Sequence, residues 1–215
     1  MNSLAIRHLK KVDNRLSCVI DFIGNITIHS YHNSFEFLVR EIVGQMISNR
    51  VKKIILDRLY VLCSGEINPD SILSLSVEDI RHTGMSSSKV FYIQNLASIV
   101  KNGSINFDNL SEMDDRSVIR ELTKIKGIGV WTSKMYLLFY LQREDVLPYE
   151  DGAFLQAYKW LYSARKLSPS TVIKKCRSWK PYSSYGARYL YVALDRGLTK
   201  REIKAFLSNE DEHYS

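Results

Sequence analysis

The chain has few cysteines, and their spacing excludes two classes of metal site. Cys18, Cys63 and Cys176 lie far apart in the 215 residues, and no two of them form a CxxC pair. Neither a structural zinc site nor a cysteine-ligated iron–sulfur cluster can therefore be assembled locally. The two histidines of the HSYH stretch at 29–32 have no further ligands clustered beside them. We expect reduced thiols, no metal and no cofactor.

The sequence also lacks long apolar runs. No apolar segment approaches the roughly 20 residues that a membrane-spanning helix needs. The first residues, MNSLAIRHLKKVDNRLSCVIDFIG, are interrupted by charges and contain no signal-peptide core. We therefore expect no membrane contact, and a location in the cytoplasm, or in the nucleus if the source has one.

Positive charge predominates in an otherwise ordinary globular composition. The 30 Lys and Arg exceed the 23 Asp and Glu by a net charge of +7, while 45% of the residues are hydrophobic. This balance suits a polyanionic partner, although many basic proteins bind no nucleic acid.

Helical periodicity dominates the pattern of apolar residues. Phe35, Leu38, Ile42 and Met46 recur at steps of three and four, which predicts one face of an amphipathic helix, and a helical pattern continues beyond Ser48. Similar patterns extend to the C-terminal region. The sequence therefore predicts an all-α fold of about ten short helices.

Several local signals mark the ends of these helices. Asp70 and Ser76 are candidate N-caps of two short helices, and Gly103 is a candidate C-cap. The stretch CVIDFIGNITI at 18–28 is the one segment that resembles a strand, and its pattern is ambiguous.

A Gly-Ile-Gly turn at 127–129 separates two predicted helices. Without Cβ atoms its backbone can approach another surface closely, and the following helix presents N–H groups and a positive dipole end. Such a turn can bind a phosphate, and Lys124 and Lys126 add positive charge, whereas Ile128 would point inward. An ordinary corner between two helices is the alternative. A nucleotide P-loop is excluded because no GK[ST] follows at the required spacing.

Four segments in order resemble one known family. The segment ELTKIKGIGVWTSKMYLL, followed by DVLPYED, resembles the helix-hairpin-helix (HhH-GPD) DNA glycosylase superfamily. The segments FEFLVREIVGQMIS and IRHTGMSSSKVFYIQNLASIV are similar to two further motifs of that family. The segment WKPYSSYGARYLYVAL is similar to a motif of the 3-methyladenine DNA glycosylase II branch.

The resemblance implies a fold and a division of the chain. Family members have two all-α lobes with a cleft between them. Here a helical bundle of residues 34–142 would contain the hairpin at 124–131. Residues 1–33 together with 143–215 would form a second helical lobe that carries the catalytic aspartate.

The family's essential aspartate corresponds to Asp151, twenty residues after Trp131. By resemblance it would stabilise the oxocarbenium-like sugar and position the attacking water. Asp151 also directly precedes a predicted helix, where an aspartate serves as an ordinary N-cap. The two roles are compatible because a helix N-terminus favours negative charge. Glu150 is the rival carboxylate, one position away from the motif.

Trp131 stands where strand-cleaving members such as endonuclease III carry a lysine nucleophile. Lys134 is the nearest lysine, but three positions along a helix rotate it by about 300°. The resemblance thus implies a glycosylase without lyase activity. It also places Trp131, Met135 and Tyr191 in the base pocket, although in this branch the position of Met135 is often aromatic. Packing in the core is the alternative for each.

The resemblance assigns the remaining DNA contacts to two loops. Met46, beside Gln45, would be the wedge that fills the gap left by an extracted base, although it could equally be buried helix core. The hairpin residues Lys126, Gly127, Ile128 and Gly129 would contact the backbone of the DNA.

These observations together predict a monofunctional DNA glycosylase of base excision repair. It would flip alkylated purines of the 3-methyladenine type out of double-stranded DNA and hydrolyse their N-glycosidic bond, as a monomer. A glycosylase for oxidised or deaminated bases, or a non-catalytic helix-hairpin-helix module, remains an alternative.

Overall fold

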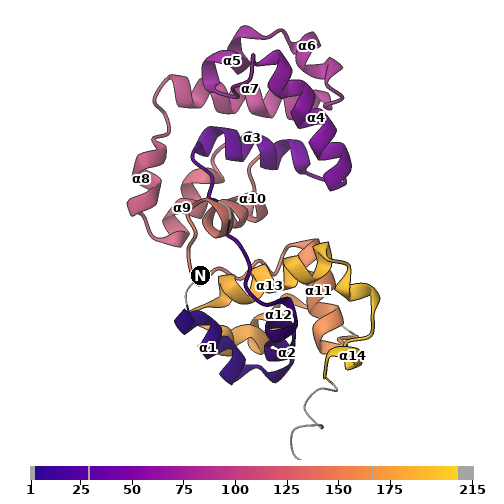
Figure 1. The fold of residues 1–215 in the computed structure, drawn as a ribbon. Helices are drawn as coiled ribbons and strands as arrows, with labels where there is room; N and C mark the ends of the chain where they lie inside the picture. Colours follow the sequence, from indigo (N-terminus) through magenta and orange to yellow (C-terminus); the bar gives the residue numbers. More distant parts are fainter. Residues whose placement is uncertain (1–2, 29, 166, 208–215) are drawn as a thin grey trace, which may run out of the picture. The chain divides into compact units, whose positions relative to one another are not determined.

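The computed structural model describes residues 3–28, 30–165 and 167–207, and these residues form helices and loops without a strand. The helices are α1 (Ser3–Val12), α2 (Asn14–Ile23), α3 (Ser34–Gly44), α4 (Asn49–Leu62), α5 (Pro69–Ser74), α6 (Val77–His82), α7 (Ser87–Lys101), α8 (Phe107–Glu112), α9 (Asp115–Leu122), α10 (Val130–Met135), α11 (Gly152–Tyr162), α12 (Pro169–Lys175), α13 (Ser183–Asp195) and α14 (Lys204–Leu207). A π-helical turn at Tyr136–Tyr140 continues α10, and 3-10 turns lie at Cys176–Trp179 and Leu198–Lys200. The all-α prediction is confirmed, with more helices than expected (Figure 1).

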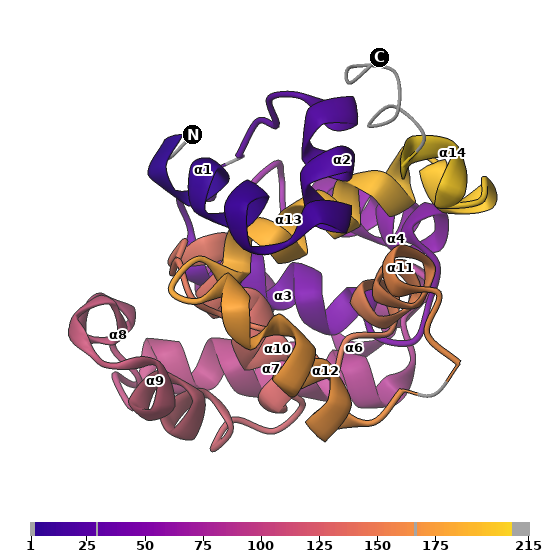
Figure 2. The same cartoon turned by 90° about the horizontal axis from the view of Figure 1, so that it is seen from below.

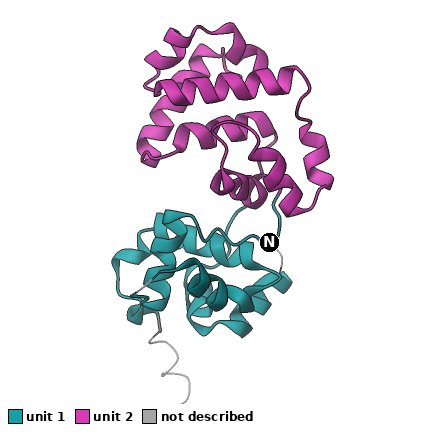
Figure 3. Ribbon diagram, turned by 180° about the vertical axis from the view of Figure 1, so that it is seen from behind, with its two compact units in different colours: residues 1–29, 142–215 teal, residues 30–141 magenta. Residues whose placement is uncertain are grey.

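The chain divides into two compact units (Figure 3). Unit 1 comprises Met1–His29 and Gln142–Ser215, and unit 2 comprises Ser30–Leu141. The boundaries expected from the family resemblance lie at 33/34 and 142/143, within a few residues of these. None of the described helices is long and apolar enough to cross a membrane.

In unit 2, α3 contacts α4, α7 and α10, and α7 also contacts α5 and α6. The predicted apolar face of α3 is correct for Phe35, Leu38 and Ile42, which are all buried. The helix ends at Gly44, so Met46 lies outside it and is fully exposed. The possibility that Met46 is buried helix core is therefore wrong.

In unit 1, α13 contacts α1, α2 and α11 (Figures 1 and 2). A buried carboxylate organises this core, because Asp13 accepts hydrogen bonds from the Tyr162 hydroxyl and from Trp179 Nε1, the latter at 3.0 Å. The Asp13 side chain also caps α2 by accepting from the backbone N–H of Leu16. The Tyr162 hydroxyl and the Trp179 indole N–H thus both have a partner, as burial of polar groups requires.

The structure corrects two of the predicted helix caps and confirms a third. The N-cap of α5 is Asn68, whose side chain accepts from Ser71, so Asp70 lies in the first turn instead. Ser76 caps α6 as predicted. Asn102 caps α7, with Gly103 following it at φ +73°, and most of the ambiguous stretch at 18–28 belongs to α2.

Candidate functional site

Asp151 is the N-cap of α11, and its carboxylate is firmly oriented. Its Oδ1 accepts a hydrogen bond from the backbone N–H of Phe154 at 2.7 Å. The same oxygen accepts from the Tyr191 hydroxyl, on α13, at 3.0 Å. With 8% of its surface exposed, Asp151 is one of the few buried carboxylates among the described residues. The N-cap prediction is confirmed, and Glu150 is exposed.

The segment that leads to Asp151 is held by two serines at the start of α13. Ser184 Oγ accepts from Val146 N at 2.9 Å and donates to the Arg143 carbonyl at 2.6 Å. Ser183 Oγ donates to Asp145 Oδ1 at 2.6 Å. Sequence reasoning quoted these serines as part of a motif, but it did not foresee that they fix the chain ahead of the aspartate.

The same motif contains a glycine that leaves room for a tryptophan. A Cβ added at Gly186 would lie 2.6 Å from Cε3 of the buried Trp179 ring. Because that ring also donates to Asp13, α13 and α2 share one anchoring side chain.

The predicted hairpin joins α9 to α10. Its first glycine is required by the backbone conformation and by a neighbouring side chain. Gly127 has φ +88°, and a Cβ there would lie 2.4 Å from Cγ of Tyr92. Gly129, the N-cap of α10, has φ −102° and open space around its Cα. Ile128 is buried as predicted, so the hairpin is held by its central side chain.

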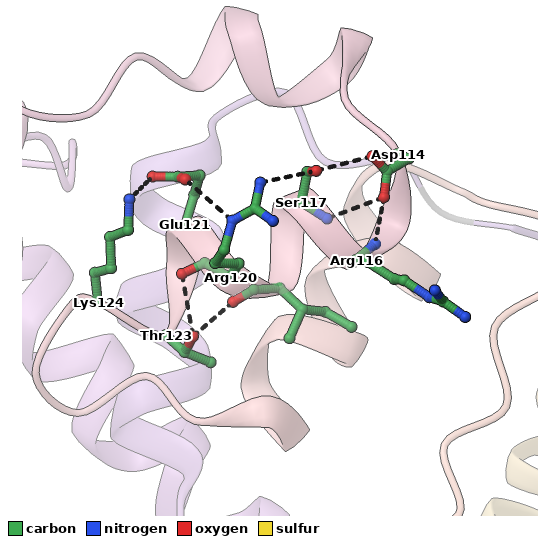
Figure 4. Close-up of polar contacts among 8 residues, drawn as sticks. Asp114, Arg116, Ser117, Arg120, Glu121, Thr123 and Lys124 are labelled. Atoms are coloured by element: carbon green, nitrogen blue, oxygen red, sulfur yellow. Dashed lines mark hydrogen bonds and ion pairs between the residues drawn. The ribbon is translucent and has the colours of Figure 1, made fainter.

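The two hairpin lysines differ in their surroundings. Lys124 pairs with Glu121 on α9, within the polar contacts drawn in Figure 4. Lys126 is exposed, with its Nζ 5.6 Å from the centre of the Phe91 ring, and it has no carboxylate partner among the described residues. The positive charge available to an anion at the hairpin is therefore that of Lys126.

Gln45 links the loop after α3 to this hairpin. Its Nε2 donates to the carbonyl of Gly127 at 2.8 Å and to Thr132 Oγ1 at 3.3 Å. The next residue, Met46, has a left-handed backbone with φ +58° and is fully exposed. The structure thus brings the predicted wedge and the predicted phosphate-binding turn into one connected surface of unit 2.

Two of the three predicted pocket residues, Trp131 and Met135, lie in unit 2. Trp131 is partly exposed in the first turn of α10, and Met135 is buried at the end of that helix. The third, Tyr191, belongs to unit 1 together with Asp151.

Comparison with known proteins identifies relatives over nearly the whole chain. Residues 39–181 match the HhH-GPD family, described as "HhH-GPD superfamily base excision DNA repair protein". The alkylbase DNA glycosidase-like protein mag2 of Schizosaccharomyces pombe is 28% identical over 87% of this chain and 91% of its own length.

Two solved structures have a similar fold. The DNA-3-methyladenine glycosidase of Bacillus halodurans has a TM-score of 0.80 and 30% identity, covering 96% of each chain. The 3-methyladenine DNA glycosylase Mag1 of Schizosaccharomyces pombe, in complex with abasic DNA, has a TM-score of 0.82 and 25% identity, covering 90% of this chain and 97% of its own.

Proposed function

The chain belongs to the HhH-GPD superfamily of base excision DNA repair proteins, and on this basis we propose that it is a monofunctional glycosylase for alkylated purines in double-stranded DNA. It would act as a monomer and without a metal. The observation that carries the proposal is the buried, doubly hydrogen-bonded carboxylate of Asp151 in a chain with this family membership.

The reaction is hydrolysis of the bond between C1′ of the sugar and the purine nitrogen. As the bond breaks, its electrons leave with the base and positive charge develops on the sugar. A fixed carboxylate stabilises that charge without reorganising at the moment of reaction. Water then adds to C1′, and Asp151 positions it and receives its proton.

Alkylated purines are suitable substrates for a site with one catalytic carboxylate and no general acid. A purine methylated at N3 carries a positive charge on its ring while it is bonded to C1′, and it departs as neutral 3-methyladenine because it takes the bonding electrons, so no general acid is needed. The electron-rich ring of Trp131 would favour a cationic base by stacking with a cation–π component. The two solved relatives are a 3-methyladenine glycosidase and a 3-methyladenine glycosylase, which supports the same class of substrate.

The identity of residue 131 argues against strand cleavage. A lyase step needs an amine that attacks C1′ and forms a Schiff base. Trp131 has no such amine, so the product would be an uncut abasic site.

DNA binding would use the connected surface of unit 2. Gly129, which has open space where a Cβ would stand, would allow close approach of a phosphate, Gly127 would give the turn its left-handed backbone, and Lys126 would supply an unpaired charge. Met46, long, apolar and fully exposed, would enter the base stack as the nucleotide leaves it.

Excision from methylated DNA by the Asp151→Asn variant tests the assignment. We expect the variant to bind duplex DNA as the wild type does and to release no measurable base. Undiminished release by the variant would refute the role of Asp151. If the wild type releases only oxidised or deaminated bases, the substrate is one of those classes and not an alkylated purine. Duplex binding without release of any base would indicate a non-catalytic module.

A further inference from the structure

The turn between α3 and α4 has a backbone that needs outside support. It contains four residues, 45–48, and Met46 within it has φ +58° and no covering neighbours. A left-handed conformation costs a residue with a side chain about 1–2 kcal/mol. Such a conformation persists only when surrounding contacts hold it.

Lys89 supplies this support from the first turn of α7. Its Nζ donates to the carbonyl of Val43 at 2.7 Å and to the carbonyl of Gln45 at 2.7 Å. The Val43 carbonyl belongs to the last turn of α3, where carbonyls lack helical N–H partners and the dipole end is negative. Desolvation by burial lowers the pKa of the Lys89 ammonium, as expected for a lysine whose head group lies against backbone carbonyls and not in open solvent.

Gln45 is thereby held at both its ends. Lys89 binds its backbone carbonyl, while its side chain donates to the Gly127 carbonyl and to Thr132 in the hairpin. The peptide group that Lys89 holds is the one that joins Gln45 to Met46. The direction in which Met46 leaves the protein surface therefore depends on the ammonium of Lys89.

We propose that Lys89 is a positioning residue for base extrusion, which acts by holding the Gln45–Met46 peptide so that Met46 enters the DNA stack in one fixed orientation. This inference rests on the proposed function and extends it to a residue that touches neither the base nor the sugar. Without this support the turn would have to become ordered while the base is extruded. The entropy cost of that ordering would raise the free-energy barrier to insertion of Met46.

Lys52 provides a matched control in the same neighbourhood. Its side chain packs over Gly44 and its Nζ pairs with Glu41 at 2.8 Å. It thus stabilises the junction of α3 and α4, but its ammonium donates to a carboxylate and not to a carbonyl of the turn. Replacing Lys52 removes a similar charge and length of chain without freeing the Gln45 carbonyl.

The kinetic test compares Lys89→Met with Lys52→Met on two DNA substrates under single-turnover conditions. One carries the lesion opposite a normal base, and the other carries it unpaired in a bulge, where extrusion is less costly. We expect Lys89→Met to slow excision from the paired substrate by about tenfold or more, since the hydrogen bonds lost are charged. The loss on the bulge should be about threefold or less, and Lys52→Met should lie near wild type on both.

Combination with Met46→Ala separates positioning from a general structural effect. If Lys89 acts through Met46, adding Lys89→Met to Met46→Ala should slow the paired substrate by no more than about twofold. Equal losses on paired and bulged DNA, or full additivity with Met46→Ala, would overturn the proposal. Lys89→Arg, which retains a charged donor, should recover part of the rate if the first variant folds poorly.

A spectroscopic test does not depend on glycosylase activity. A nitroxide on Met46→Cys, in a background without the three native cysteines, should give a broader spectrum with Lys89 than with Lys89→Met. An unchanged spectrum would contradict the role of Lys89 even if the enzyme excises alkylated bases. If Lys89→Met sharpens the spectrum but the wild-type protein releases no base, then Lys89 does support the turn and the proposed function is refuted.

Discussion

Replacement of Tyr191 by phenylalanine isolates one hydrogen bond of the proposed catalytic carboxylate. The Tyr191 hydroxyl donates to Asp151 Oδ1 at 3.0 Å, and the variant removes this hydroxyl while keeping the ring. A hydrogen bond to a charged group contributes about 1.5–3 kcal/mol. If that energy is used to orient the carboxylate in the transition state, the rate should fall by about 10-fold to 150-fold.

Single-turnover release of base from methylated duplex DNA measures this loss. DNA affinity should not change, because Tyr191 contributes through Asp151 and not through phosphate contacts. Tyr185→Phe is the matched control, since it lies on the same helix and its hydroxyl bonds the exposed Glu144 at 3.2 Å. An unchanged rate in Tyr191→Phe, or an equal loss in Tyr185→Phe, would refute the reasoning.

Three further predictions concern the hairpin and the core of unit 2. Gly127→Ala places a Cβ against Tyr92 in a left-handed backbone and should lower the free energy of unfolding by about 2–5 kcal/mol, measured by thermal unfolding. Gly129→Ala, which has open space, should change it by no more than about 1 kcal/mol. Equal melting temperatures of the two variants would contradict this. Lys126→Gln should weaken duplex binding and reduce its salt dependence by about one counterion, while Lys124→Gln, already paired in the wild type, should change both less. Burial raises the pKa of Tyr136 from its ordinary value of 10 to about 12, so the folded state favours the neutral phenol. The contribution of the neutral phenol to the free energy of unfolding is complete below pH 10 and is lost as the pH rises from 10 to 12. Tyr136→Phe should flatten this decline when the free energy of unfolding is measured by chemical denaturation at each pH.

The sequence predicted what local patterns determine. Periodicity gave the buried face of α3 because every third or fourth residue of a helix lies on one side. Ser76 and Asp151 were found as N-caps because a cap contacts backbone groups only three residues away. Asp70 was wrong because Asn68, followed by Pro69, competes for the same role two residues earlier.

The rest depends on contacts between distant parts of the chain. Met46 continues the apolar periodicity of α3, and only the end of the helix at Gly44 removes it from the core. The hydrogen bonds of Lys89 to the turn, and of Trp179 to Asp13, join residues more than forty positions apart. No periodicity or spacing in the sequence encodes such pairs, although the resemblance quoted both Lys89 and Trp179 within its motifs.

The central claim is tested most directly by one incubation of the wild-type protein with methylated duplex DNA. Free bases are identified by chromatography, and the strands are analysed on a denaturing gel before and after alkali. We expect release of 3-methyladenine, strands that are intact until alkali cleaves the abasic sites, and no adduct trapped by borohydride. Intact methylated DNA with no base released, or strand cleavage with a trapped adduct before alkali, would contradict it.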